Sequence, residues 1–341
     1  MNKDMYLIRA VEMATIAAYK FIGRKNKNAI DFAAVEAMTI MLDNAPIKCR
    51  IIVGEGELDQ APMLFVNQEL GKGKTLTYDL AVDPVEGTYP AAYNIAGSIA
   101  CLAAAPNTIL KLPEMYMEKL FVGPDLQDAI NNEDDFITNI KTMQKMKKHN
   151  DLIGIILDKP RHQKIIEKLH DLGIIVRLIG DGDVLAAIDV INKEADFVYG
   201  IGGAPEGALM AALALSAGGN IKTKLISYQT IWPTDEDTKI RINIEDIAIK
   251  KYKLSYNKYY FAKDLVKDEN VRFVATGLTA GGSLKVFKYY YGTYYLNTSF
   301  VSHGVVRNME VTYSVSQVNK LLPSVKKIMK IYNRLLAKLW Y

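Results

Sequence analysis

Acidic side chains gather in two short segments, each of which directly follows an apolar run. The segment GEGELD places Glu55, Glu57 and Asp59 within five residues, and DPVEGT places Asp83 and Glu86 together. Hard cations such as Mg²⁺ and Mn²⁺ take carboxylate, carbonyl and water oxygens as ligands. Without a cation, carboxylates in such clusters repel one another. One such segment alone is also compatible with an ordinary acidic turn, but two at equivalent strand ends favour a divalent-cation site.

The residues that follow Asp83 shape the second acidic segment. Pro84 holds Asp83 extended, so that its carboxylate projects from the end of the strand. Gly87 allows the chain to turn immediately. Thr88 then stands at the start of a helix or turn, where backbone N–H groups can face an anion. The segment therefore has the features of a site that holds a metal ion beside an anionic group.

Length and composition limit the class of protein. The chain has 341 residues, 50% hydrophobic and 23% charged, which indicates a folded, soluble protein of about two domains and excludes disordered, collagen-like and disulfide-scaffold proteins. Two cysteines, Cys49 and Cys101, fit a reducing compartment and cannot form a zinc site alone. No apolar run reaches the ~18 residues of a membrane span, and the N-terminus lacks a signal-peptide pattern. We expect a cytoplasmic location.

The formal net charge of +4 is unevenly distributed along the chain. Residues 319–341 carry six bases and no acid, which leaves 36 bases against 38 acids in the remainder. Binding to nucleic acid requires a basic face that neutralises phosphates. A mildly acidic body therefore predicts that nucleic acid is not a partner.

Periodicity predicts the elements that position these segments. In the first half, apolar spacing indicates helices over 4–22 and 31–42 and strands at 50–53, 78–82 and 95–105. From residue 152, strand and helix alternate at 152–157, 160–172, 174–179, 184 onward, 197–200 and 206 onward, which predicts a parallel sheet with right-handed crossovers. Residues 228–270 are charged and are expected to be irregular, and β-rich segments follow them.

The predicted fold class is α/β, with an N-terminal α+β half and a C-terminal half built on a mostly parallel sheet. We expect a metal-binding domain over residues 1–150 and a substrate-binding domain over residues 151–341. Residues 271–316 are β-rich enough to return to the first sheet. Residues 317–341 are expected to form a basic amphipathic tail.

Six segments occur in a fixed order over residues 53–207: VGEGELDQAPM, DPVEGT, PEMYMEKLFVGP, DKPRH, GDGDV and GIGGAPEG. In this order they resemble class II (GlpX-type) fructose-1,6-bisphosphatase, within the lithium-sensitive sugar-phosphatase superfamily. The segment GRKNKNAIDFAAVEAM resembles the family's first-helix region, and a weaker likeness continues to about residue 310. DPVEGT alone indicates only the superfamily, whereas GEGELDQAPM with GIGGAPEG is more specific. The resemblance implies a layered sugar-phosphatase fold and Mn²⁺ or Mg²⁺ as cofactor.

The resemblance also implies three groups of site residues. Those at metal-ligand positions are Asp31, Glu55, Asp83, Glu86 and Glu206. Those at the catalytic centre are Lys27, Glu57, Asp59 and Thr88, where Thr88 would hold the attacking water. Those that contact the sugar phosphate are Glu86, Gly87, Thr88, Tyr116, Lys159, Pro160, Arg161, Asp181, Gly182, Asp183 and Gly203.

Several of these residues also have simpler explanations. Asp31 is suited to cap a helix N-terminus, and Glu206 to favour a helix dipole. Lys159 and Arg161 could be solvated surface charges, and Asp181 with its neighbours a simple turn. The four histidines show no ligand spacing and are expected to be surface or structural residues: His149, His162, His170 and His303.

The chain also departs from the family pattern in three places. Tyr89 follows DPVEGT where relatives commonly carry an arginine. The segment ATGLTAGGSLKVF lacks the acidic residue usual in the family's corresponding segment. Beyond residue 316 the sequence does not resemble the family.

The resemblance implies hydrolysis of the C1 phosphate of fructose 1,6-bisphosphate to fructose 6-phosphate, in gluconeogenesis. Sedoheptulose-1,7-bisphosphatase activity, alone or as a second activity, is the alternative. An inositol- or nucleotide-phosphate phosphatase is disfavoured by GIGGAPEG. A catalytically inactive binding protein is disfavoured because all five ligand positions hold carboxylates.

The tail has an apolar stripe at alternate spacings of four and three residues: Val318, Leu322, Val325, Met329, Tyr332, Leu336 and Leu339. This spacing predicts a helix whose first turn contains Pro323. The helix could pack on its own subunit, form a subunit interface or rest on an anionic membrane, and the last is the least favoured. We expect a homo-oligomer, either a dimer or a tetramer.

Overall fold

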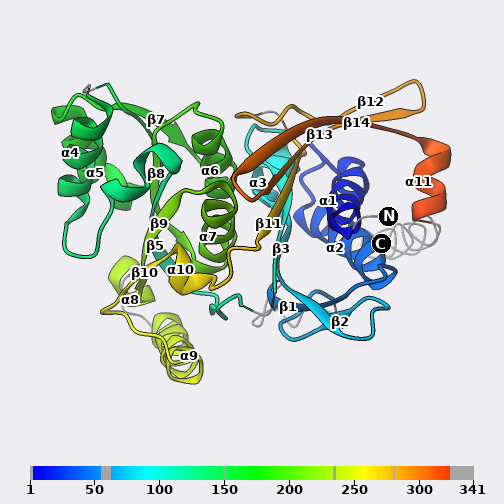
Figure 1. The fold of residues 1–341 in the computed structure, drawn as a ribbon, viewed down its shortest axis with the longest axis horizontal. Coiled ribbons are helices and arrows are strands. Elements are labelled where there is room, and N and C mark those ends of the chain that lie inside the picture. The colour runs from blue at the N-terminus through cyan, green and yellow to red at the C-terminus, as the bar shows by residue number, and fades with distance from the viewer. Residues whose placement is uncertain are drawn as a thin grey trace.

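The computed structural model describes residues 3–54, 63–106, 108–148, 151–232, 236–279 and 281–322. These residues form two mixed β-sheets with helices between them and on their outer faces (Figure 1). The helices are α1 (Asp4–Tyr19), α2 (Lys27–Asp43), α3 (Thr88–Tyr93), α4 (Phe136–Lys147), α5 (Gln163–Asp171), α6 (Asp183–Ile191), α7 (Ala204–Ala217), α8 (Tyr228–Ile231), α9 (Glu236–Tyr252), α10 (Ala262–Leu265) and α11 (Val315–Leu321), with 3₁₀ turns η1 (Pro124–Ala129) and η2 (Pro160–His162).

The first sheet has eight strands in the order β12-β13-β11-β4-β3-β1-β2, and β14 also pairs with β13. These strands are β1 (Lys48–Val53), β2 (Glu69–Leu70), β3 (Leu76–Glu86), β4 (Ile99–Ala105), β11 (Arg272–Gly277), β12 (Lys288–Tyr290), β13 (Thr293–Ser302) and β14 (Val305–Ser314). β1 is parallel to β3, while β4 pairs antiparallel with both β3 and β11. Residues 272–314 therefore lie in the same sheet as the N-terminal strands.

The second sheet has the order β10-β9-β5-β8-β6-β7. Its strands are β5 (Tyr116–Val122), β6 (Ile153–Leu157), β7 (Ile175–Ile179), β8 (Phe197–Gly203), β9 (Asn220–Ile226) and β10 (Tyr259–Phe261). β6 pairs in parallel with β7 and β8, whereas β5 pairs antiparallel with β8 and β9, and β10 antiparallel with β9. The α/β class is confirmed, but the prediction of a mostly parallel sheet is wrong. The alternation of strands and helices from residue 152 did not predict this sheet, because β5, which precedes residue 150 in the chain, inserts between β8 and β9 and is antiparallel to both.

The layers alternate between helices and sheets. Helices α1 and α2 cover one face of the first sheet, and α6 and α7 fill the space between the two sheets. Helices α4 and α5 cover the outer face of the second sheet. The predicted domain boundary at residue 150 stays a prediction. The two sheets do not divide at that residue: β5, which precedes it, lies in the second sheet, and β11 to β14, which follow it, lie in the first.

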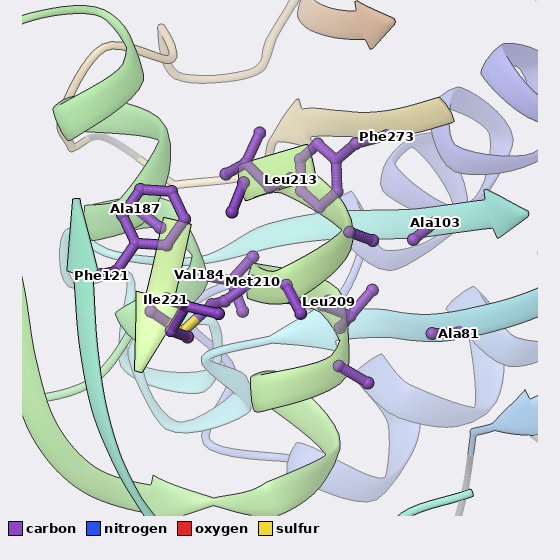
Figure 2. Close-up of a cluster of buried hydrophobic side chains, with 14 of the residues drawn as sticks. Ala81, Ala103, Phe121, Val184, Ala187, Leu209, Met210, Leu213, Ile221 and Phe273 are labelled. Atoms are coloured by element: carbon purple, nitrogen blue, oxygen red, sulfur yellow. The ribbon is translucent and has the colours of Figure 1, made fainter. Parts of the chain in front are cut away.

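The middle layer packs through small side chains. Figure 2 shows Leu209, Met210 and Leu213 of α7 between Ala81 and Ala103 of the first sheet and the strands of the second. Alanine on the sheet face allows the helix to approach closely, so that burial of the leucines supplies the hydrophobic free energy. This packing fixes the start of α7 relative to the end of β3.

One sequence expectation on local structure needs correction, and another cannot be compared with the structure. The region 228–270, expected to be irregular, contains the 17-residue helix α9. Its apolar residues lie among charges with little segregation to one face, so periodicity gave no signal. In the tail, α11 ends at Leu321, and the helix predicted from Pro323 onward lies outside the described residues.

Candidate active site

A cavity of about 600 Å³ opens between the two sheets. Its wall is built from the start of α2, the end of β3, the start of α3 and the β8–α7 junction, with α8 and α9 on the remaining side. Among the described residues, nine of the predicted site residues line it: Lys27, Asp31, Asp83, Gly87, Thr88, Tyr116, Asp181, Gly203 and Glu206. Segments far apart in sequence thus converge on one space.

Asp31 lies one turn inside α2 and does not cap it. The helix begins at Lys27, and the side chain of Asn26 accepts the capping hydrogen bond from the Ala29 N–H at 3.0 Å. The Thr88 hydroxyl lies 3.0 Å from Asp31 Oδ1 and donates to it. Burial raises the pKa of Asp31 to about 6, against the lowering effects of Thr88 and Lys27. The capping alternative therefore does not account for this carboxylate.

The segment DPVEGT is the last part of β3 and the turn into α3. Asp83 Oδ1 accepts a hydrogen bond from the Val85 N–H at 3.1 Å. Gly87 has a φ of +79°, and a Cβ at this position would lie 2.6 Å from the Gly97 carbonyl oxygen. Only glycine permits this turn. The Thr88 oxygen lies 3.1 Å from the Val85 carbonyl as well as close to Asp31, so its single proton has two acceptors.

Glu86 and Glu206 each have one buried carboxylate oxygen that lacks a hydrogen-bond partner within the described residues. Glu86 Oε1 accepts from the Val184 N–H at the start of α6, at 3.2 Å. Burial raises the pKa of both, and Asp183 and Asp83 raise that of Glu86 further. A buried carboxylate oxygen without a partner is costly. Such an oxygen can serve as a ligand of a divalent cation, so the chemistry of these two residues fits a metal ion.

Gly203 leaves room for the Glu206 carboxylate. A Cβ at residue 203 would lie 2.1 Å from Glu206 Oε2. The carbonyl of Gly203 accepts a hydrogen bond from Lys119 Nζ at 2.8 Å, and the same ammonium pairs with Asp183 at 2.5 Å. Lys119 is itself buried. The pair thus anchors the β8–α7 junction, and Asp183 is not among the residues that line the cavity.

The bases of DKPRH bond to backbone carbonyls. Lys159 Nζ donates to the Gly180 carbonyl at 2.8 Å. Arg161 donates through Nε and Nη2 to the Ile201 carbonyl, and its guanidinium lies 5.5 Å from the Tyr116 ring centroid. Neither of these two side chains is part of the cavity wall. Pro160 begins the 3₁₀ turn η2, and Gly182 precedes α6 with a φ of +91°.

Of the three described histidines, His170 is exposed in the last turn of α5, and the other two form hydrogen bonds within the fold. His162 is buried, and its ring nitrogens contact the Leu157 carbonyl and the Ile201 N–H. It is a structural residue, as expected. His303 bonds through its ring to Ser302 and Asn270 at the β13–β14 turn. Neither lines the cavity.

The ligand set is incomplete within the described residues. Glu55, Glu57 and Asp59 lie outside them. Across the part of the chain that is described, no group of three or more Asp, Glu, His or Cys side chains is gathered as a cation site. The two cysteines, Cys49 and Cys101, are buried free thiols.

Tyr89, at the position where the family resemblance implies an arginine, lines the cavity. The ammonium of Lys27 lies 5.0 Å from its ring centroid. A cation over an aromatic face is attracted by the ring quadrupole. Tyr89 therefore positions the Lys27 cation rather than adding a cation of its own.

Sequence reasoning did not identify the cavity side formed by α8 and α9. Tyr228, Arg241, Ile244 and Glu245 line the cavity there. Their sequence signal was weak, because they lie in a charged region without periodicity or a recognisable motif.

Two mixed sheets separated by helices, with an acidic cavity at the ends of β3 and β8, are typical of an α/β sugar phosphatase. The chain belongs to the family described as bacterial fructose-1,6-bisphosphatase, glpX-encoded, whose model matches residues 1–313. It is 40% identical over 284 residues to a class 2 fructose-1,6-bisphosphatase of Haemophilus influenzae, over 81% of this chain and 85% of that one. It is 38% identical over 283 residues to fructose-1,6-bisphosphatase 1 class 2 of Escherichia coli strain K12, over 81% of this chain and 84% of that one.

The family match confirms the resemblance drawn from the six segments, and it ends close to where that resemblance fades. In the described residues, no helix combines the length and apolarity that a membrane crossing requires.

Proposed function

We propose that this protein hydrolyses the C1 phosphate of fructose 1,6-bisphosphate to fructose 6-phosphate and inorganic phosphate, as part of gluconeogenesis. The observation that carries the proposal is the convergence of Asp31, Asp83, Thr88 and Glu206 on one cavity with Lys27 beside them. The relatives named as fructose-1,6-bisphosphatases support the substrate.

Dependence on a metal ion is general to this family, and we propose Mn²⁺ or Mg²⁺ here. Asp31, Asp83, Glu86 and Glu206 would hold it, together with Glu55. When bound, a divalent ion activates water as a nucleophile and neutralises charge on the phosphoryl group. The partnerless oxygens of Glu86 and Glu206 support this assignment.

The other residues of the proposed catalytic centre bind the phosphate that is cleaved and orient the attacking water. Thr88 donates its proton to Asp31 or to the Val85 carbonyl, so its oxygen accepts a hydrogen bond from the attacking water and orients it. Lys27 adds positive charge next to the phosphate that is cleaved. Glu57 and Asp59 are proposed for the same centre. The proposed mechanism uses water as the nucleophile and has no covalent intermediate, in keeping with a described cavity wall that holds neither cysteine nor histidine.

The remaining predicted contacts hold the sugar and its second phosphate: Tyr116, Lys159, Pro160, Arg161, Asp181, Gly182, Asp183 and Gly203, with Glu86 and Gly87. Tyr116 and Asp181 face the cavity directly. Sedoheptulose 1,7-bisphosphate differs by one carbon and carries the same two phosphates, so it stays the alternative substrate. We also propose a homo-oligomer, a dimer or tetramer, in the cytoplasm.

Phosphate release tests the proposal. The protein is treated with EDTA, and inorganic phosphate is measured on fructose 1,6-bisphosphate, sedoheptulose 1,7-bisphosphate, inositol 1-phosphate and a nucleoside monophosphate, with no metal, Mn²⁺ or Mg²⁺ added. We expect release from a sugar bisphosphate only with metal. Full activity after chelation would reject the metal assignment, and preference for inositol or nucleoside phosphate would reject the substrate.

A further inference from the structure

Among the described residues, the cavity wall contains one guanidinium, and no motif assigns its role. Arg241 of α9 lines the cavity, on the side formed by α8 and α9. Lys27, the other base in the described wall, lies at the start of α2 near Asp31. Figure 1 shows α9 projecting beside α8, at one end of the second sheet.

Glu245 fixes how α9 is turned. Its carboxylate is buried and accepts hydrogen bonds from the Ser227 hydroxyl at 3.2 Å and from the Tyr228 N–H at 3.0 Å. The Glu245 carboxylate thus provides an acceptor for a free backbone N–H group at the N-terminus of α8 and connects α9 to α8. Residues four apart share a helix face. Arg241, four residues before Glu245, is therefore held on the side of α9 that faces the cavity.

Aromatic rings hold the guanidinium in place. Arg241 lies 5.1 Å from the Tyr228 ring centroid. The Tyr228 ring is 5.9 Å from that of Tyr116 and is stacked 6.0 Å from that of Trp232. Trp232 Nε1 donates to the Tyr116 hydroxyl at 3.1 Å. A guanidinium stacked on a ring keeps its in-plane N–H donors directed outward, which suits forked contact with a phosphate.

The charge of a sugar bisphosphate favours a role for the Arg241 guanidinium in binding the substrate. A sugar bisphosphate carries two phosphates, and the cleaved one lies among carboxylates that hold the metal. The bases predicted for the other phosphate lie outside the cavity wall, and each donates to a backbone carbonyl: Lys159 to that of Gly180 and Arg161 to that of Ile201. Within the described chain, six carboxylates line the cavity against Lys27 and Arg241: Asp31, Asp83, Glu114, Asp181, Glu206 and Glu245.

We propose that Arg241 binds the phosphate of the substrate that is not hydrolysed, and so selects sugar bisphosphates over sugar monophosphates. The inference rests on the proposed function, because it assumes a substrate with two phosphates. Arg241 does not touch the reacting atoms, so it determines specificity and does not take part in the chemical step. Tyr228 positions it.

The test compares two substrates in the metal-loaded protein. Fructose 1-phosphate lacks the phosphate assigned to Arg241. In Arg241→Gln the KM for fructose 1,6-bisphosphate should rise about 10- to 100-fold, as for loss of hydrogen bonds to a charged group, with little change in kcat. The kcat/KM for fructose 1-phosphate should change by less than about twofold. Arg241→Lys keeps the positive charge but loses the two-pronged donor geometry of the guanidinium, so its KM for fructose 1,6-bisphosphate should lie between those of the wild type and Arg241→Gln.

Lys250→Gln is the matched control. Lys250 is exposed on the same helix, and at ~100° per residue it lies on the face opposite Arg241. It should leave both substrates unaffected. A second measurement uses the product: calorimetry should show that fructose 6-phosphate, which carries only the retained phosphate, loses affinity in Arg241→Gln by a similar factor.

Each outcome decides the matter. Equal losses on fructose 1,6-bisphosphate and fructose 1-phosphate would show that Arg241 supports the whole site, and would overturn the proposal. An unchanged KM with unchanged fructose 6-phosphate affinity would overturn it too. A wild-type protein that fails to hydrolyse fructose 1,6-bisphosphate would overturn the proposed function instead, while fructose 6-phosphate binding would still decide whether Arg241 holds a phosphate.

Discussion

Buried carboxylates in two regions of the molecule have opposite hydrogen-bond environments. Glu12 of α1 lies between the helix layer and the first sheet, and both of its oxygens are satisfied, by the Thr298 hydroxyl at 3.2 Å and the Tyr313 hydroxyl at 2.5 Å. Glu86 and Glu206, beside the cavity, each leave one oxygen without a partner in the described chain. Burial raises the pKa in all three cases.

The difference separates a structural role from a functional one. A fully satisfied buried network rigidifies the fold. A buried carboxylate left half-satisfied costs stability unless a ligand completes it. Burial and a shifted pKa alone therefore do not mark the site. Among these three buried glutamates, the partnerless carboxylate oxygen is what separates Glu86 and Glu206 from Glu12.

The largest effect is expected from Glu206→Gln. Replacing a charged ligand by a neutral amide should weaken Mn²⁺ binding and lower kcat/KM on the order of 1,000-fold, the equivalent of several kcal/mol of metal-derived stabilisation. The metal-free melting temperature should not fall, because a neutral amide is cheaper to bury than a carboxylate. Phosphate release, Mn²⁺ titration and thermal melting measure the three quantities.

Glu12→Gln serves as its control, and it should retain turnover and Mn²⁺ affinity. If Glu12→Gln lost as much activity as Glu206→Gln, the contrast between satisfied and partnerless carboxylates would carry no functional information.

Thr88→Ala should produce the next largest effect. The variant loses the hydroxyl that contacts Asp31 but keeps every proposed metal ligand. We expect kcat to fall about 100-fold, the range for one orienting group at a reacting centre, with Mn²⁺ affinity close to that of the wild type. Calorimetric Mn²⁺ titration beside steady-state kinetics separates the two roles. Loss of metal binding in this variant would make Thr88 part of the ligand shell.

Gly203→Ala should act more weakly, through Glu206. The added methyl would lie 2.1 Å from the present position of Glu206 Oε2, so the carboxylate must move. Mn²⁺ affinity should fall about tenfold, as when an orienting partner of a ligand is lost, while the melting temperature changes little. Ala208→Gly on α7 is the control that reports on general perturbation of that helix. An unaltered Mn²⁺ affinity in Gly203→Ala would argue against Glu206 as a ligand.

The smallest effect concerns Glu12 and pH. Burial raises the pKa of Glu12 above its ordinary value of 4.5, so the folded state holds a proton that the unfolded chain releases. Stability contributed by this group is therefore lost as pH rises above 4.5. The melting temperature of the wild type relative to Glu12→Gln should fall by about 2–4 °C between pH 4 and pH 8. A difference that grew with pH would mean that Glu12 is stabilised as a carboxylate.

The six ordered segments determined the family and the residues of one side of the site. They did so because the chemistry is local: DPVEGT combines a strand end, an extended aspartate and a glycine turn within six residues. Helices α1, α2, α6 and α7 and strands β3, β6 and β7 also follow from local periodicity, which is governed by which face each element buries.

The order of strands in the second sheet could not be predicted, because it depends on long-range pairing. Nothing in the sequence of β5 indicates that it pairs antiparallel with both β8 and β9. The alternation of strands and helices after residue 152 predicted a parallel sheet. Likewise, aspartate is a residue type that often caps a helix N-terminus, so Asp31 was a candidate for that role. Only the folded chain shows that Asn26 caps the helix instead.

The sequence by itself determined the types of residue at the site, since carboxylates, a threonine and turn glycines are set by chemistry and local backbone geometry. Only the tertiary structure decided which of them share a cavity, which carboxylate oxygens lack a partner in the described chain, and that Arg241 lines the same cavity as Lys27. Burial and satisfaction depend on what other elements place around a group. For α9 that arrangement is fixed by Glu245 across a contact with α8, which no local pattern encodes.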